Sequence, residues 1–113
     1  MEITGDTRPL AQIDTDALVT YAFEQEKLVE GVLSQLDGAI GGALSKLAAS
    51  GELTGKMLET VLLYYPQGMA AQRIFILGAG KKEKFGTAEL RRLAGAAVRA
   101  LKSRQVKRLA GIY

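Results

Sequence analysis

The sequence lacks several residue types that carry chemistry in other proteins. Its 113 residues contain no cysteine, which excludes disulfides, thiolate metal sites and cysteine nucleophiles. They contain no histidine either, so the commonest general base and the commonest metal ligand are absent. No apolar run is long enough to span a membrane, and the first ten residues lack the apolar segment of a secretory signal. We therefore expect a soluble, cytoplasmic domain.

The residues that are present have the composition of one globular domain with an uneven charge. Hydrophobic residues make up 48% and charged residues 24%, which is ordinary for a chain that can bury its own core. Residues 1–60 hold four Lys/Arg and ten Asp/Glu, a net of −6, whereas residues 61–113 hold eleven and two, a net of +9. Such halves suit contact within one fold, contact between subunits, or a basic half that faces an anionic partner.

Hydrophobic periodicity predicts alternating strands and helices. Nearly continuous apolar runs predict strands at 16–23, 59–66 and 73–77, a further strand from 107, and possible extra strands in the first 15 residues. The second and third strands are separated by a short connection, so we expect neighbours or a hairpin. Strands buried on both faces and alternating with helices indicate an α/β layered domain with a mixed or mostly parallel sheet.

Two helices are expected between these strands. Leucine and isoleucine recur at spacings of three and four from Leu33 to Leu47, which predicts one helix ending near Gly51. The glycines at 38, 41 and 42 within it suggest a close approach of the helix to the sheet. Thr87 is a candidate N-cap for the second helix, whose apolar stripe runs from Leu90 to Leu101 with Glu89 in the first turn.

The Gly-Ala-Gly-Lys segment at 78–81 leaves a predicted strand and precedes a predicted helix, as a phosphate-binding loop would. A dinucleotide fingerprint needs a third glycine at position 83, which is glutamate here, and Gly86 comes three residues too late. A Walker-type loop is also missing. We therefore interpret Gly78 and Gly80 as residues that let the chain turn with positive φ.

Acidic residues show no catalytic or metal-binding pattern. Asp14 and Asp16 precede a strand and are interpreted as turn residues rather than metal ligands, and Glu24, Glu26 and Glu30 as a solvated connection. We assign no catalytic, cofactor-binding or metal-ligating residue in this chain.

Basic residues gather in the second half of the sequence. Arg92, Arg99 and Lys102 lie at spacings of seven and three on the second helix, and they are the candidate nucleic-acid contacts. The alternatives are a solvated helix face or a contact between subunits. The other members of this basic set are Lys81, Lys82, Lys84, Arg91, Arg104, Lys107 and Arg108.

Three segments closely resemble the N-terminal domain of the cytosol (leucyl) aminopeptidase family, peptidase family M17. They are Ala-Ser-Gly-Glu-Leu-Thr-Gly-Lys at 49–56, the strand at 73–77 with its Gly-Ala-Gly-Lys exit, and the Ala-Gly-Ala-Ala segment at 94–97. The resemblance covers most of the chain, and it is clearest from about residue 36 to residue 112.

This resemblance implies a macro-domain-like layered sandwich spanning residues 1–113, cut from a longer protein. The family's two-metal site, with Mn or Zn, lies in a C-terminal catalytic domain that releases N-terminal residues from peptides. Its Asn-Thr-Asp-Ala-Glu-Gly-Arg segment is absent here. The resemblance further implies hexamers, a role of this domain in assembly and substrate access, and DNA binding in some bacterial members. True macro domains bind ADP-ribose, so residues 78–82 are a further candidate ligand site.

Overall fold

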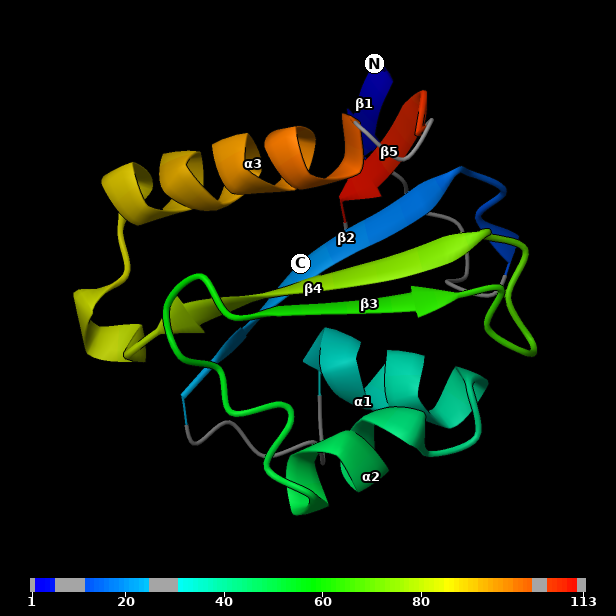
Figure 1. The fold of residues 1–113 in the computed structure, drawn as a ribbon, viewed down its shortest axis with the longest axis horizontal. Helices are drawn as coiled ribbons and strands as arrows, with labels where there is room; N and C mark the ends of the chain where they lie inside the picture. Colours follow the sequence, from blue (N-terminus) through cyan, green and yellow to red (C-terminus); the bar gives the residue numbers. More distant parts are fainter. Residues whose placement is uncertain (1, 6–11, 25–30, 103–105, 112–113) are drawn as a thin grey trace.

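The computed structural model describes residues 2–5, 12–24, 31–102 and 106–111, which form a five-stranded sheet with helices on both faces (Figure 1). The strand order is β1-β5-β2-β4-β3, with three parallel pairings and an antiparallel pairing of β3 with β4. The strands are β1 (Glu2–Gly5), β2 (Ala17–Phe23), β3 (Thr60–Tyr64), β4 (Arg73–Gly80) and β5 (Arg108–Gly111). The helices are α1 (Gly31–Ala39), α2 (Ala43–Ala49), the 3-10 turn η2 (Lys82–Lys84) and α3 (Thr87–Lys102).

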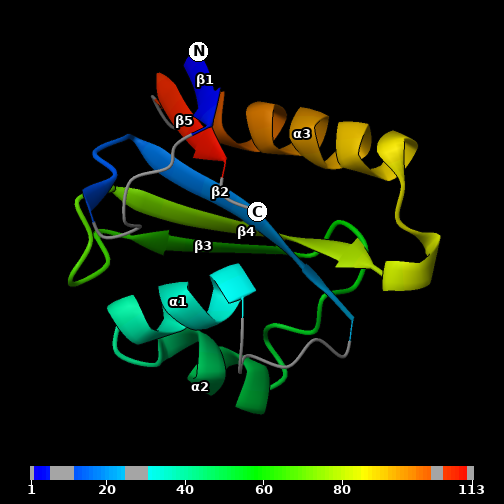
Figure 2. The same cartoon turned by 180° about the vertical axis from the view of Figure 1, so that it is seen from behind.

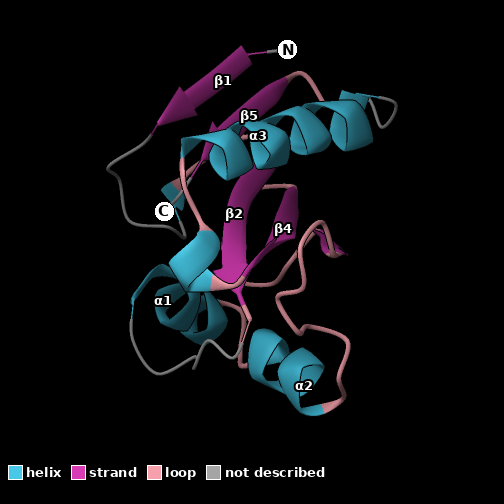
Figure 3. Cartoon of the chain, turned by 90° about the vertical axis from the view of Figure 1, so that its left-hand side faces the viewer, coloured by secondary structure: helices cyan, strands magenta, loops and turns pink. Residues whose placement is uncertain are grey.

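The helices are divided between the two faces of the sheet. Figure 3 shows α3 on one side of the strands and α1 with α2 on the other, and the view from behind in Figure 2 agrees. The expected α/β layered sandwich with a mixed, mostly parallel sheet is therefore confirmed.

Alternation along the central strands builds two hydrophobic cores. In β4, Ile74 and Ile76 face the layer of α1 and α2, whereas Phe75 and Leu77 face α3. Every residue of β4 from Ile74 to Gly80 is buried. Because both faces are covered, these strands read as continuous apolar runs in the sequence.

The prediction of one continuous helix from Leu33 to Leu47 is wrong, because two helices, α1 and α2, occupy this stretch. Gly41 and Gly42 have φ of 74° and 84°, a conformation that ends a helix and that glycine adopts readily. Asp37 then accepts hydrogen bonds on Oδ1 from the backbone N–H of Leu44 (2.9 Å) and Ser45 (3.1 Å), capping α2 from the preceding helix. The apolar spacing survives the break, so Leu33 and Leu44 still share one core.

The glycines of this region do not mark a close approach of helix and sheet, contrary to expectation. A Cβ atom built at residue 38, 41 or 42 would meet nothing within 4 Å outside its own helix turn. Two of the three are needed for the turn and not for packing.

The remaining strands confirm the expected pattern. The strands β3 and β4 are antiparallel neighbours, paired from Thr60 opposite Leu77 to Tyr64 opposite Arg73. The strand expected near the end of the sequence is β5, which lies between β1 and β2. An extra strand, β1, is present in the first 15 residues.

The start of α3 differs by one residue from the expected cap. The helix begins at Thr87, so the capping position belongs to Gly86, whose carbonyl accepts from the backbone N–H of Leu90 at 3.0 Å. The Gly86 N–H donates to Oε2 of Glu89 at 3.0 Å, which is one half of a capping box. Of the helices in the described segments, none has the length and apolar character needed to cross a bilayer.

Candidate functional site

The Gly-Ala-Gly-Lys turn lies where β2 and β4 end, at the carboxyl end of the parallel strands. This end of an open α/β sheet is where such folds bind ligands. The segment 53–58 runs beside it, and Lys81, Lys82 and Lys84 follow it with exposed side chains. The position therefore suits a phosphate site, and the backbone donors decide whether one can form.

The backbone donors of both glycines are bonded within the domain. The N–H of Gly78 donates to the carbonyl of Glu59 at 2.7 Å, and the N–H of Gly80 donates to the carbonyl of Gly55 at 2.9 Å. The carbonyls of Gly78 and Gly80 accept from Leu58 and Glu24, each at 2.9 Å. A phosphate cradle needs N–H groups that point at the ligand, and these two point at the neighbouring loop.

Close contact between that loop and the strand explains the glycines. A Cβ atom on Gly78 would lie 1.7 Å from the carbonyl oxygen of Lys56, and one on Gly55 would lie 2.3 Å from that of Phe23. Gly80 has φ of 74°, as expected for a turn. Gly78 does not share this conformation, so the expectation of positive φ is wrong there and the requirement is steric.

Glu59 holds the Thr54-Gly55-Lys56 segment in place. Its Oε1 accepts from the backbone N–H of Thr54 (2.7 Å) and Gly55 (3.0 Å), and its Oε2 accepts from the Thr54 hydroxyl (2.6 Å). Burial raises the pKa of Glu59, but hydrogen bonds from Thr54 and Gly55 and the charge of Lys56 outweigh it, so the pKa is lowered overall. The Glu59 carboxylate therefore has a structural role, which is to hold Thr54 and Gly55 in position beside β4.

Asp16 joins the starts of β2 and β5. Its Oδ2 accepts from the backbone N–H of Lys107 (2.7 Å) and Arg108 (2.9 Å). Burial acts to raise the pKa of Asp16, and these two bonds, with the charges of Arg108 and Arg73, lower it overall. The side chain thus serves a turn between strands, and Asp14 beside it is exposed.

These carboxylates do not fit a metal centre. Asp16, Asp37 and Glu59 each have a carboxylate oxygen that accepts from backbone N–H groups of this chain, and the second oxygens of Asp37 and Glu59 accept from the hydroxyls of Ser45 and Thr54. Within the described segments, no three side chains among His, Cys, Asp and Glu gather closely enough to hold an ion.

An aromatic cluster anchors the lysine-rich turn to β2. Phe85 stacks on Tyr21 with ring centroids 5.1 Å apart and meets Phe23 edge-on at 5.1 Å. The Nζ atom of Lys82 lies 6.0 Å from the centre of the Phe23 ring. These contacts hold η2 against the sheet while its lysines face solvent.

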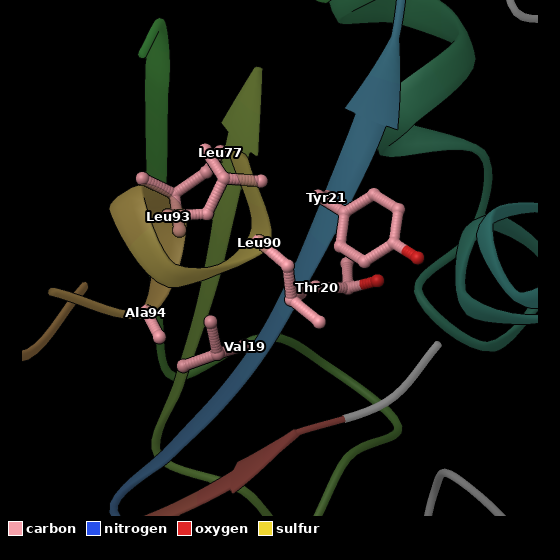
Figure 4. A pocket seen from close by; sticks show the side chains of 7 residues that line it. All are labelled: Val19, Thr20, Tyr21, Leu77, Leu90, Leu93 and Ala94. Atoms are coloured by element: carbon pink, nitrogen blue, oxygen red, sulfur yellow. The ribbon is translucent and has the colours of Figure 1, made fainter. Parts of the chain in front are cut away.

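A small hollow separates the first turns of α3 from the sheet (Figure 4). It offers about 30 Å³ to water-sized molecules, far below the roughly 300–1,000 Å³ of ordinary ligand pockets. Leu90 is 39% exposed at its rim. The lining residues are Val19, Thr20, Tyr21, Leu77, Leu90, Leu93 and Ala94.

The candidate nucleic-acid residues lie on one exposed stretch of α3. Arg92, Arg99 and Lys102 are all exposed, and their spacing places them on the same side of the helix. Arg99 folds back along the helix, so that its Nη1 lies 3.1 Å from where a Cβ on Gly95 would be. Of the other expected basic residues, Arg91, Lys107 and Arg108 are exposed, and Arg104 lies outside the described residues.

Comparison with known proteins decides the family. The family described as "Cytosol aminopeptidase family, N-terminal domain" matches residues 19–111. The chain belongs to this family. A "Probable cytosol aminopeptidase" of Solibacter usitatus is 43% identical over 110 residues, covering 97% of this chain and 21% of the relative. A "Cytosol aminopeptidase" of Haemophilus influenzae is 36% identical over 88 residues, covering 78% and 18%.

The chain corresponds to the N-terminal domain of the cytosol aminopeptidase family, and it spans about a fifth of the length of these relatives. Among solved structures, its fold is similar to the macrodomains of DarG from Mycobacterium tuberculosis and Thermus aquaticus. The TM-scores are 0.70 and 0.67 at 19% and 15% identity, covering 96% and 97% of this chain and 74% of each macrodomain chain. At this identity the likeness concerns the fold, which confirms the expected macro-domain-like sandwich.

Two of the three segments that indicated the cytosol aminopeptidase family, at 49–56 and 73–81, contain residues with a clear structural role. Thr54, Gly55 and Gly78 all serve the contact between segment 53–58 and β4. Sequence reasoning missed the roles of Glu59 and Asp37. A signal for the first was present, because a threonine and a glutamate five residues apart flank a tight turn.

Proposed function

We propose that this domain is a non-catalytic support within a longer aminopeptidase, with a role in assembly and in substrate access. The supporting observation is that the carboxyl ends of β2 and β4, where a ligand site would form, are closed by the domain's own backbone. The Gly78 N–H donates to the carbonyl of Glu59, and the Gly80 N–H donates to the carbonyl of Gly55.

The two divalent metals of such an enzyme, Mn or Zn, would then be held by the C-terminal catalytic domain of the longer protein. The carboxylates of Asp16 and Glu59 are engaged with backbone donors, which is consistent with that division of labour. On this proposal the longer protein is a cytoplasmic hexamer whose peptide preference resides outside residues 1–113.

An activity assay tests the first part of this proposal. The purified chain is incubated with a leucine anilide and added Mn²⁺ or Zn²⁺, and we expect no turnover above the metal-only background. Turnover that follows the protein through purification would overturn the proposal.

Deletion in a relative tests the second part. Removing the region of the Solibacter usitatus relative that this chain matches, which is 21% of that relative, is expected to reduce the number of subunits per particle in light scattering or to raise KM for long peptides more than for the anilide. A folded deletion protein with the same number of subunits and unchanged KM values would contradict the role in assembly and access.

A second candidate function is nucleic-acid binding by the exposed cations of α3. The observation that favours it is the placement of Arg92, Arg99 and Lys102 on one side of a helix. Binding through phosphates weakens with salt, by about 0.9 in log K per log unit of salt for each phosphate neutralised on duplex DNA. Absence of binding to duplex DNA at low salt would exclude this function for the isolated domain.

A further inference from the structure

The outer edge of β3 carries backbone groups that no strand of the described chain pairs. β3 is the last strand of the sheet and has β4 as its neighbour on one side (Figure 1). The hydrogen bonds just beyond its two ends fix which residues bond inward. The Gly78 N–H donates to the carbonyl of Glu59, and the Tyr65 N–H donates to the carbonyl of Gln72.

Bonded and non-bonded pairs alternate in an antiparallel ladder. With the observed register, Val61 and Leu63 bond inward to β4, and Thr60, Leu62 and Tyr64 direct their N–H and C=O groups outward. The three residues whose backbone groups point outward are therefore arranged symmetrically along the strand, with Leu62 in the middle.

The five residues of β3 lack the side chains that most often prevent edge strands from pairing. The sequence Thr-Val-Leu-Leu-Tyr contains no charge, no proline and no glycine, whereas natural edges commonly carry lysine, proline or a covering segment. Exposed large apolar residues also gather here. Three of the four found among the described residues are Leu58 (42% exposed), Tyr64 (54%) and Tyr65 (71%), within or beside β3.

Backbone strain brackets the same strand. Leu58 has φ of 65° and Tyr65 has φ of 47°, and they are the non-glycine residues with positive φ in the described segments. Leu58 forms a bulge with Glu59 opposite Gly78, because the Leu58 N–H donates to the carbonyl of Gly78 while the Gly78 N–H donates to Glu59. Glycine is the usual residue at this position of such a bulge. Strain of this kind tends to lie at functional positions.

We propose that β3 pairs antiparallel with β3 of a second copy of this chain, about a two-fold axis at Leu62. Leu62 then faces the partner copy's Leu62, and Thr60 faces the partner copy's Tyr64. Each of the three opposed pairs exchanges two backbone hydrogen bonds, and the two sheets become continuous. A second copy is the occupant that the edge fits because the outward groups are self-complementary under this rotation and because the uncharged edges bring no like charges together.

The β3 contact would be one way in which this domain supports assembly, and only its biological purpose rests on the proposed function. The two fail separately. A catalytically active chain would overturn the support role without affecting dimerisation, and a monomeric chain would overturn the β3 contact without affecting the support role.

The test uses two double variants that differ in the sign of the charge at residue 64. Thr60→Lys with Tyr64→Lys places like charges opposite each other twice across the axis, whereas Thr60→Lys with Tyr64→Glu places opposite charges there. Both variants remove the contact of Tyr64 with Arg73. Because residue 64 pairs with Arg73 within the chain, the new charge also changes the stability of each monomer, which thermal unfolding measures separately from dimerisation. Within one chain, residues 60 and 64 are too far apart along a strand to pair.

Sedimentation equilibrium of the 113-residue chain measures the outcome, with thermal unfolding as the check that each variant is folded. We expect a wild-type dimer, a dissociation constant at least about tenfold weaker in the Lys/Lys variant, and recovery in the Lys/Glu variant. Amide hydrogen exchange should show concentration-dependent protection at Thr60, Leu62 and Tyr64. A wild-type chain that stays monomeric up to about 1 mM, or folded variants with equal dissociation constants, would overturn the proposal.

Discussion

The backbone N–H of Gly80 donates a 2.9 Å hydrogen bond to the carbonyl oxygen of Gly55. This bond joins the end of β4 to the loop at 53–58, and it uses a donor that a phosphate site at the Gly-Ala-Gly-Lys turn would need. The turn follows a strand and precedes a helix, as a nucleotide-binding loop does, but the N–H groups of Gly78 and Gly80 point at backbone carbonyls of the domain.

Replacing Gly78 with alanine should destabilise the domain strongly. The new Cβ would lie 1.7 Å from the carbonyl oxygen of Lys56, and backbone on both sides leaves little room to relax. We expect a loss of about 3 kcal/mol or more in the free energy of unfolding by urea. Gly38→Ala is the matched control: it lies in α1 with nothing within 4 Å and should stabilise by about 0.5–1 kcal/mol. Equal effects of the two changes would contradict this account.

Replacing Leu58 should separate backbone strain from side-chain loss. Leu58→Gly and Leu58→Ala both remove the side chain beyond Cβ, but only glycine adopts the observed φ of 65° without strain. We expect the glycine variant to be more stable than the alanine variant by about 1 kcal/mol in urea unfolding. An alanine variant as stable as the glycine variant would show that the left-handed conformation at residue 58 is absent in solution.

Glu59→Gln should lower stability at neutral pH and have little effect in acid. Because the folded-state pKa of Glu59 lies below its ordinary value of 4.5, its stabilising effect is present above about pH 4.5 and is lost as the pH falls through the folded pKa. We expect a cost of about 1 kcal/mol at pH 7, with the difference from wild type shrinking as the pH falls below about 4.5. Asp14→Asn, at an exposed site, is the control. A difference that stays constant down to the acid-unfolding transition would rule out the carboxylate as the cause.

The combined variant Arg92→Ala, Arg99→Ala and Lys102→Ala tests the basic side of α3. If duplex DNA binds there, the slope of log K against log salt should become shallower by about 0.9 for each lost phosphate contact. Lys46→Ala, on α2 across the sheet, should leave the slope unchanged, as measured by fluorescence anisotropy. Equal slopes for the combined variant and wild type would place any DNA binding elsewhere.

ADP-ribose should not bind at residues 78–82. Both glycine N–H groups there already donate to backbone carbonyls, and opening those bonds would leave buried carbonyls unsatisfied. We expect no heat above dilution in calorimetry with millimolar ADP-ribose. A saturable heat that Gly80→Ala removes would show that this end of the sheet can open.

The sequence predicts which segments form the strands and helices of this fold better than it predicts which residues contact one another. β2, β4 and α3 have long periodic patterns, because burial on two faces or along one stripe leaves a direct trace in the sequence. The break at Gly41 and Gly42 leaves a weaker trace, since two short helices joined by a tight turn keep the spacing of one. The bulge at Leu58 carries no glycine to indicate it.

Interactions across the sheet could not be predicted from local patterns. The position of β5 between β1 and β2 depends on parallel pairing between segments about a hundred residues apart. The bonds from Lys107 and Arg108 to Asp16 depend on the same pairing. The sequence led us to assign no catalytic residue because the residue types that would carry the chemistry are missing, and this stays a prediction. The hydrogen bonds of Gly78 and Gly80 could not be inferred from the sequence.

The place of β5 in the sheet also sets an order of events during synthesis. The ribosome releases β1 first, yet its neighbour in the sheet is β5, near residue 110. β2, α1, α2, β3 and β4 can assemble earlier because their contacts lie closer along the chain. Strand β1 therefore lacks its β5 neighbour until residue 108 and those after it have emerged, and nascent chains stalled before residue 108 should remain open to proteases at β1.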